Sequence, residues 1–290
     1  MGHAPTAPSE SRQTARAADA HHGQMDEATA FLATLAVTAP DAPTACAGWS
    51  AHSLVAHLAA GAAEMASLTE ETLCGRPARA TAAFEQREAP FAALDDDTLR
   101  GRLVTEALRL DAAAAALEQS GARVRFAGAM LDAAALRLHG RSEAAVHRWD
   151  LAGHDDVSRE LLAQPALTAH AVETLNAMVA GSSEDVSARA RRAGPGRFRA
   201  TFATPGAPDV VLTVDDGGGR LSLVDPAPRP TARADAATRL LALWGRRPPT
   251  TDVEWTDDEG AAARLARFLW GPAAPARSGR RSATPLSETR

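Results

Sequence analysis

The chain has 290 residues, 45% of them hydrophobic and 23% charged, with a formal net charge of −5. This acidic balance excludes general affinity for nucleic acid, which needs a basic face. No apolar run approaches the roughly 20 residues that a helix needs to cross a bilayer, so no membrane association is expected. The sequence also lacks Lys, Ile and Tyr, and all 31 basic residues are therefore Arg. Any positively charged group in an active site must then be an arginine, a protonated histidine or a metal ion.

Both ends of the chain mix Pro, Ser, Ala and Arg without any period. Residues 1–22 and 271–290 are therefore predicted to be disordered tails. The first stretch has no apolar segment typical of a secretory leader. Cys46 and Cys74 stand alone, without the spacing of a metal clip or the density of a disulfide scaffold. We therefore expect a cytoplasmic protein in which both cysteines are inert.

Residues 23–181 have the apolar spacing of long helices. The first is expected at 25–37, and the second at 50–73 with Ser50 as its N-cap. After an Ala- and Arg-rich loop, the remaining helices are expected at 95–121, 131–152 and 165–180. The third begins at an acidic run that suits the positive end of a helix. Helices of this length predict an antiparallel four-helix bundle with one appended helix.

The hydrophobic period changes from helical to alternating after a hinge-like run at 181–196. Three alternating segments separated by Pro-Gly and Gly-Gly-Gly predict strands, and the glycines at 217–219 predict a hairpin turn. Helices are expected at 235–244 and 258–270, with a short strand between them. Residues 182–270 are therefore predicted to form a small α+β domain. The expected fold class is a helical bundle followed by an α+β domain.

The segment HGRSEAAVHRWD offers the best candidates for a metal site. Glu143 and His147 lie four residues apart and share one helix face, and His139 lies one turn earlier on that face. His139 and His147 are about 12 Å apart along the axis, so only one of them binds an ion together with Glu143. His57, in an apolar stretch of the second helix, is the best candidate for the third ligand, whereas His52 lies on another part of that helix.

Two histidines, one glutamate and an open fourth position are typical of catalytic zinc. The same set also holds Fe(II) in oxygen-activating enzymes. The plainer alternative is that Glu143 and His147 form a solvated pair and that His57 is a hydrogen-bonded core histidine. Spacing alone leaves these alternatives open.

Two stretches, GWSAHSLVAHLAAG and EAAVHRWDLAG, together resemble the mycothiol-dependent maleylpyruvate isomerase family of DinB/YfiT-like helical bundles. The segment LLALWGRRPP with the amphipathic helix after it is similar to that family's sterol-carrier-like C-terminal domain. The resemblance covers about residues 23–270. It implies that His57, Glu143 and His147 bind zinc, and that mycothiol is the thiol cofactor.

This resemblance implies a reaction as well as a ligand set. A zinc-held thiolate would add reversibly to a maleylpyruvate-like unsaturated dioxo acid and so convert its cis double bond to trans. An arginine must then stabilise the enolate and carboxylates, because the chain has no lysine. The family uses an arginine of the C-terminal domain, which makes Arg246 the candidate, with Arg247 beside it. Asp150, three residues after His147, is expected to accept a hydrogen bond from a ligand imidazole.

Two other functions remain open at this stage. A mycothiol S-transferase would use the same metal and thiol to modify an electrophile, in detoxification or natural-product biosynthesis. A regulatory protein would bind the metal without catalysis, although the complete set His57, Glu143 and His147 argues against loss of the site. In each case the expected partners are small molecules, and the chain is expected to be a monomer or a homodimer.

Overall fold

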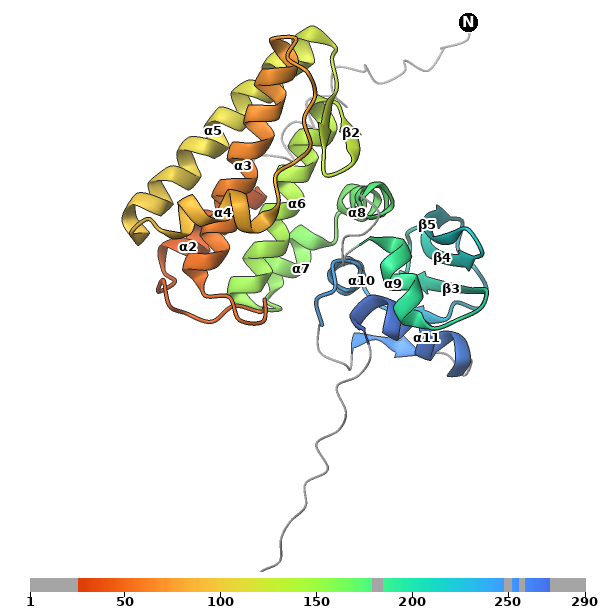
Figure 1. Cartoon of the computed structure of the whole chain (residues 1–290). Coiled ribbons are helices and arrows are strands. Elements are labelled where there is room, and N and C mark those ends of the chain that lie inside the picture. Colours follow the sequence, from red (N-terminus) through yellow and green to blue (C-terminus); the bar gives the residue numbers. More distant parts are fainter. Residues whose placement is uncertain (1–25, 179–184, 248–251, 256–258, 272–290) are drawn as a thin grey trace, which may run out of the picture. The chain divides into compact units, whose positions relative to one another are not determined.

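The computed structural model describes residues 26–178, 185–247, 252–255 and 259–271. The chain separates into two compact units, Met1–His170 and Ala171–Arg290. The predicted boundary was at 181/182, whereas this division falls within the helix at Pro165–Ala177 (α8, Figure 1). The predicted tails at 1–22 and 271–290 lie outside the described residues, apart from Gly271.

The first unit is a bundle of helices, as predicted. Its long members are α2 (Glu27–Ala36), α3 (Ala51–Leu73), α5 (Asp96–Ser120) and α6 (Ala133–Ala152). Helix α3 packs along α5 and also contacts α6, while α2 packs against α6 (Figure 1). Among the parts of the chain that the structure describes, no helix is both long enough and apolar enough to cross a membrane.

Helix starts in this unit are fixed by short polar side chains. Ser50 accepts a hydrogen bond from the backbone N–H of Ser53 and so caps α3, as predicted. Asp95 caps α5 in the same way, and Asp96 and Asp97 follow it in the first turn. Helix α5 ends at Gly121, whose φ of 65° is a left-handed conformation that glycine adopts without a steric penalty.

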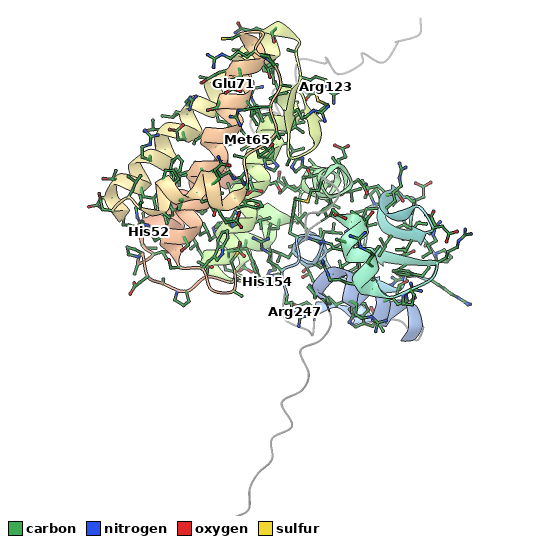
Figure 2. The ribbon with its side chains drawn as sticks, in the orientation of Figure 1. His52, Met65, Glu71, Arg123, His154 and Arg247 are labelled. Atoms are coloured by element: carbon green, nitrogen blue, oxygen red, sulfur yellow. The ribbon has the colours of Figure 1, made fainter. Side chains whose placement is uncertain are left out.

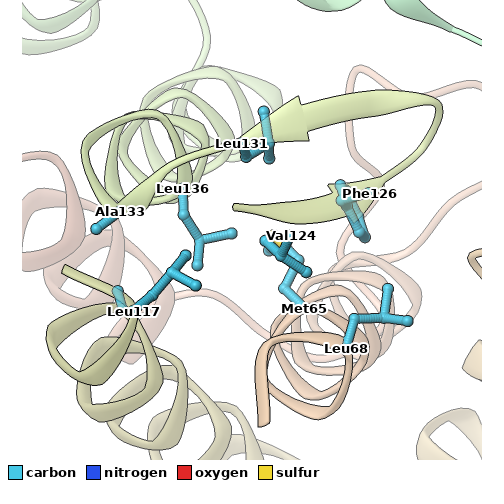
Figure 3. Packing of buried hydrophobic residues seen from close by; sticks show 9 residues of the cluster. Met65, Leu68, Leu117, Val124, Phe126, Leu131, Ala133 and Leu136 are labelled. Carbon is cyan, nitrogen blue, oxygen red and sulfur yellow. The ribbon is translucent and has the colours of Figure 1, made fainter. Parts of the chain in front are cut away.

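Two apolar clusters hold the bundle together. One lies between α3, α5, α6 and the hairpin before α6, and contains Met65, Leu117, Phe126 and Leu136 (Figure 3). The other lies at the opposite end of α3, where Leu54, Val55 and Ala59 meet residues of α2 and α5. The second cluster includes the stretch of α3 that carries His57, so the helix is anchored on both sides of that residue.

The second unit is the predicted α+β domain. Its sheet has the strand order β5-β4-β3-β6-β7, in which β3 and β6 are parallel and the other pairs are antiparallel. The strands are Phe198–Ala203 (β3), Asp209–Asp215 (β4), Gly218–Val224 (β5), Ala232–Arg233 (β6) and Glu254–Trp255 (β7). Helix α10 (Ala236–Leu243) follows β6. Helix α11 (Glu259–Trp270) packs against α9 (Val186–Ala193) and β3.

Several short elements were not predicted. The expected loop after α3 contains helix α4 (Phe84–Ala92), and a hairpin of β1 (Val124–Phe126) and β2 (Ala129–Leu131) precedes α6. Helix α7 (Asp156–Leu162) follows α6. The run expected to be a hinge contains helix α9 (Val186–Ala193), and residues 179–184 lie outside the description. These segments are short or rich in Ala and Arg, so they lack the long apolar repeat on which the prediction relied.

The contact between β5 and α9 gives a test of the second unit. A Cβ atom added at Gly219 would lie 2.8 Å from the carbonyl oxygen of Val186 and 2.8 Å from Ala190 Cβ. Gly219→Ala should therefore lower the free energy of unfolding by about 1–3 kcal/mol. Thermal denaturation followed by circular dichroism measures the change. Gly101→Ala, in open space within α5, is the control and should stabilise by about 0.5–1 kcal/mol. A Gly219→Ala protein as stable as the wild type would contradict this packing.

Candidate metal centre

Helices α3 and α6 bring together the three side chains that the sequence singled out. The potential ligand atoms of His57, Glu143 and His147 all lie within 4.8 Å of one another. Glu143 Oε2 is 3.4 Å from His147 Nε2 and 3.7 Å from His57 Nε2. These separations are long for hydrogen bonds. They are close to the roughly 3.3 Å between neighbouring ligands of a tetrahedral zinc ion with bonds of about 2.0–2.1 Å. The three atoms therefore fit a common divalent metal ion.

The remote nitrogen of each imidazole contacts a carboxylate. His57 Nδ1 lies 2.7 Å from Glu88 Oε1 on α4. His147 Nδ1 lies 2.8 Å from Asp150 Oδ2, although this ion pair is not aligned as a linear hydrogen bond. A proton on each Nδ1 leaves the lone pair of each Nε2 facing Glu143. Partners of this kind fix the tautomer and the ring orientation of metal-binding histidines.

The third histidine on α6, His139, lies on the other oxygen of the same carboxylate. His139 Nε2 is 3.9 Å from Glu143 Oε1, and its Nδ1 is 3.0 Å from His170 Nε2. Burial lowers the pKa of His139, and it lowers the pKa of His170 to about 4. Both rings are therefore neutral at physiological pH. The structure thus places His147 and His57 on one oxygen of Glu143 and His139 on the other.

The surroundings of Glu143 keep its carboxylate ionised. Burial alone would raise the pKa of Glu143, but the imidazoles of His147 and His57 that face it outweigh this effect and hold that pKa well below its usual range. For His57 the burial effect is likewise outweighed, and contacts with Glu143 and Glu88 raise its pKa. The carboxylate thus supplies the charge that attracts a cation, and an arriving metal ion must displace protons from the imidazoles.

The site remains open on one side. The side chain of Glu143 keeps 26% of its exposure and that of His57 keeps 14%. Trp49 lies 5.1 Å from the His57 ring, and Phe84 stacks on that ring at 5.6 Å between centroids. A structural zinc site is closed by its protein ligands, whereas a catalytic one keeps a position for water or substrate. The exposure of Glu143 is in keeping with the second kind.

Cys46 has surroundings that the sequence did not suggest. Both cysteines stand alone in the sequence, but Cys46, His147 and Asp150 form a second group of potential ligand atoms within 4.8 Å. Cys46 Sγ donates to Asp150 Oδ2 at 3.3 Å. The sequence did not predict this group because Cys46 lies in a loop far from Asp150 in the sequence, so no local spacing reports the contact. Cys74 is exposed.

Of the remaining candidates, one belongs to α3 and two belong to the second unit. His52, labelled in Figure 2, contacts Asp96 and the Ala92 carbonyl. Arg246 belongs to the second unit, where it follows α10 and its Nη1 donates to the Trp244 carbonyl at 3.1 Å. Its catalytic role stays a prediction. Arg247, labelled in Figure 2, donates to the Trp270 carbonyl.

Helix α4 supplies residues that the sequence analysis missed. Phe84, Arg87 and Glu88 have the spacing i, i+3, i+4 and therefore share a helix face, which was the available signal. It was obscured by the few apolar residues in this segment and by Pro90 within the helix. Phe84 and Glu88 both contact His57. The predicted loop is thus a helix that forms one wall of the candidate centre.

Comparison with known proteins gives a family and a fold. Residues 21–152 match the family model described as "Mycothiol maleylpyruvate isomerase N-terminal domain". A crystal structure of a histidine-to-alanine mutant of the mycothiol-dependent maleylpyruvate isomerase matches with a TM-score of 0.51 and 15% identity. The match covers 80% of this chain and 90% of that one. A second crystal structure of that isomerase gives 0.49 and 15%, over 78% and 89%. No curated protein sequence matches the chain. At this identity the structural match shows the fold alone.

The metal ligands can be tested without any assumption about activity. Protein purified without chelator and then loaded with zinc should contain close to one zinc per chain. His57→Ala and His147→Ala should each lose most of it, because each removes one of three ligands. His52→Ala, on the same helix as His57, is the matched control and should keep its zinc. Elemental analysis by mass spectrometry gives the stoichiometry. Full zinc content in both ligand variants would refute the assignment.

The role of α4 in holding His57 gives a second test. Glu88→Ala removes the acceptor of His57 Nδ1, so zinc affinity should fall about 10- to 100-fold. Competition with a fluorescent zinc chelator measures the affinity. Glu85→Ala is the control, because Glu85 is an exposed residue of the same helix. Equal affinities for the two variants would mean that Glu88 does not orient the ligand.

Proposed function

We propose that the protein, whose residues 21–152 belong to the mycothiol maleylpyruvate isomerase N-terminal domain family, is a zinc-dependent enzyme. It uses the low-molecular-weight thiol mycothiol to isomerise a maleylpyruvate-like unsaturated dioxo acid from cis to trans. The convergence of two imidazole Nε2 atoms on one oxygen of Glu143 is the observation that carries the proposal. The exposure of Glu143 supports a catalytic site, because it leaves room for a fourth ligand.

The ligand set suits thiol chemistry. Two neutral histidines and one glutamate would leave a bound zinc ion with a net charge of +1, and such an ion holds a thiol as its thiolate well below the free pKa of about 8.5. In the proposed reaction an S–C bond forms at one alkene carbon while the π electrons move into an enolate. Rotation about the new single bond follows, and loss of the same S–C bond restores the alkene and the thiol. The thiol is therefore not consumed.

The protein's own residues have distinct tasks in this scheme. Glu88 and Asp150 hold the two imidazoles in the tautomer that presents Nε2 to the centre. The rings of Trp49 and Phe84 lie beside His57 and form an aromatic wall next to the proposed centre. The enolate and the substrate carboxylates need a positive charge, which must come from arginine in a chain without lysine. Arg246 is the candidate that the family resemblance suggests.

A direct assay tests this proposal. Zinc-loaded protein should convert maleylpyruvate only when mycothiol is present, and His147→Ala should lose at least 100-fold in kcat/KM because the metal ligand is gone. Absorbance and chromatographic separation of the cis and trans acids follow the conversion. A stable adduct of substrate and thiol, detected by mass spectrometry, would instead indicate the S-transferase. No thiol-dependent change in a zinc-loaded protein would refute both.

A further inference from the structure

Arg87 lies near the candidate centre but has no role in holding the metal ligands. It precedes Glu88 on α4, and its guanidinium carbon lies 4.4 Å from the centroid of the Phe84 ring. Phe84 in turn stacks on His57. The cation is thus one aromatic ring away from a candidate metal ligand. Within the described ranges, the buried Nε of Arg87 has no hydrogen-bond partner.

In the described part of the first unit, the other arginines either pair with a carboxylate or, like Arg76, Arg123 and Arg125, are exposed to solvent. Arg79 pairs with Glu64 at 2.6 Å, Arg141 with Glu27 at 2.7 Å and Arg148 with Asp155 at 2.7 Å. The carboxylates near Arg87 are already engaged, because Glu64 binds Arg79, Glu88 binds His57 and Glu143 faces the histidines. Burial lowers the pKa of Arg87, although nearby Glu88, Glu143 and Glu64 oppose this. A guanidinium nevertheless keeps its charge at physiological pH.

A half-buried cation that has no carboxylate partner of its own is unfavourable unless an anion binds to it. The guanidinium fork has five N–H donors and matches a carboxylate in a two-hydrogen-bond geometry. We propose that Arg87 binds a carboxylate group of the substrate beside the metal centre, and so selects carboxylate-bearing electrophiles. This inference rests on the proposed function, and it adds a binding residue from the first unit to the predicted role of Arg246.

Maleate, a cis dicarboxylate without a reactive ketone, is a suitable probe. Its dissociation constant for zinc-loaded protein can be measured by titration calorimetry in the absence of thiol. Arg87→Ala should raise the constant about tenfold or more, and Arg87→Lys should recover part of the loss because it restores the charge but not the fork. Arg125→Ala is the control, because Arg125 is an exposed residue of β1 in the same unit. Maleamide, which has no charge, should show no difference between the variants.

Three outcomes would overturn the assignment. One is equal maleate affinity in wild type and Arg87→Ala. The second is a loss of maleamide affinity in Arg87→Ala as large as its loss of maleate affinity. The third is a loss of zinc from Arg87→Ala. The second and third outcomes would each show that Arg87 supports the structure of the site instead of binding an anion. The experiment involves neither thiol nor turnover. A protein that binds maleate through Arg87 but does not isomerise maleylpyruvate would therefore refute the proposed function and keep this inference.

Discussion

The ionised carboxylate of Glu143 is the group around which the first unit is organised. An enclosed carboxylate is stable only when nearby groups compensate its charge. Here the compensation comes from imidazoles on two different helices, with His147 on α6 and His57 on α3. Small side chains, among them Ala56, Ala59 and Ala145, occupy buried positions on these two helices.

Helix α4 contributes side chains to one side of the candidate centre. Glu88 contacts the remote nitrogen of the His57 imidazole, Phe84 stacks on that imidazole, and Arg87 places a positive charge over the Phe84 ring. All three belong to a helix of nine residues that contains a proline and has no buried residue. Such a helix gains little from its own sequence, so its contacts with α3 must hold it in place. Metal binding at His57 and the position of α4 are therefore coupled.

The sequence predicted those parts of the site that depend on local geometry. Glu143 and His147 lie on one face because a helix places residues four apart together, and the long helices themselves were evident from their apolar spacing. Helix α4 was not predicted, because it forms through contacts between residues 31 positions apart, such as His57 and Glu88. The surroundings of Cys46 were missed for the same reason, since Asp150 is 104 positions away. A role for Arg246 depends on the relation between two units, which no local pattern reports.

The absence of lysine and tyrosine gives the candidate centre a simple electrostatic character. Arginine charges stay fixed across physiological pH, so histidines are the groups that titrate near neutrality. His139 and His170 are kept neutral by burial, whereas the pKa values of His57 and His147 are raised by the carboxylates that face them. Glu143 therefore attracts protons as well as metal ions. A metal ion has one advantage over protons at this site. It can bind the two Nε2 atoms and the Glu143 oxygen at the same time, whereas each proton binds a single nitrogen.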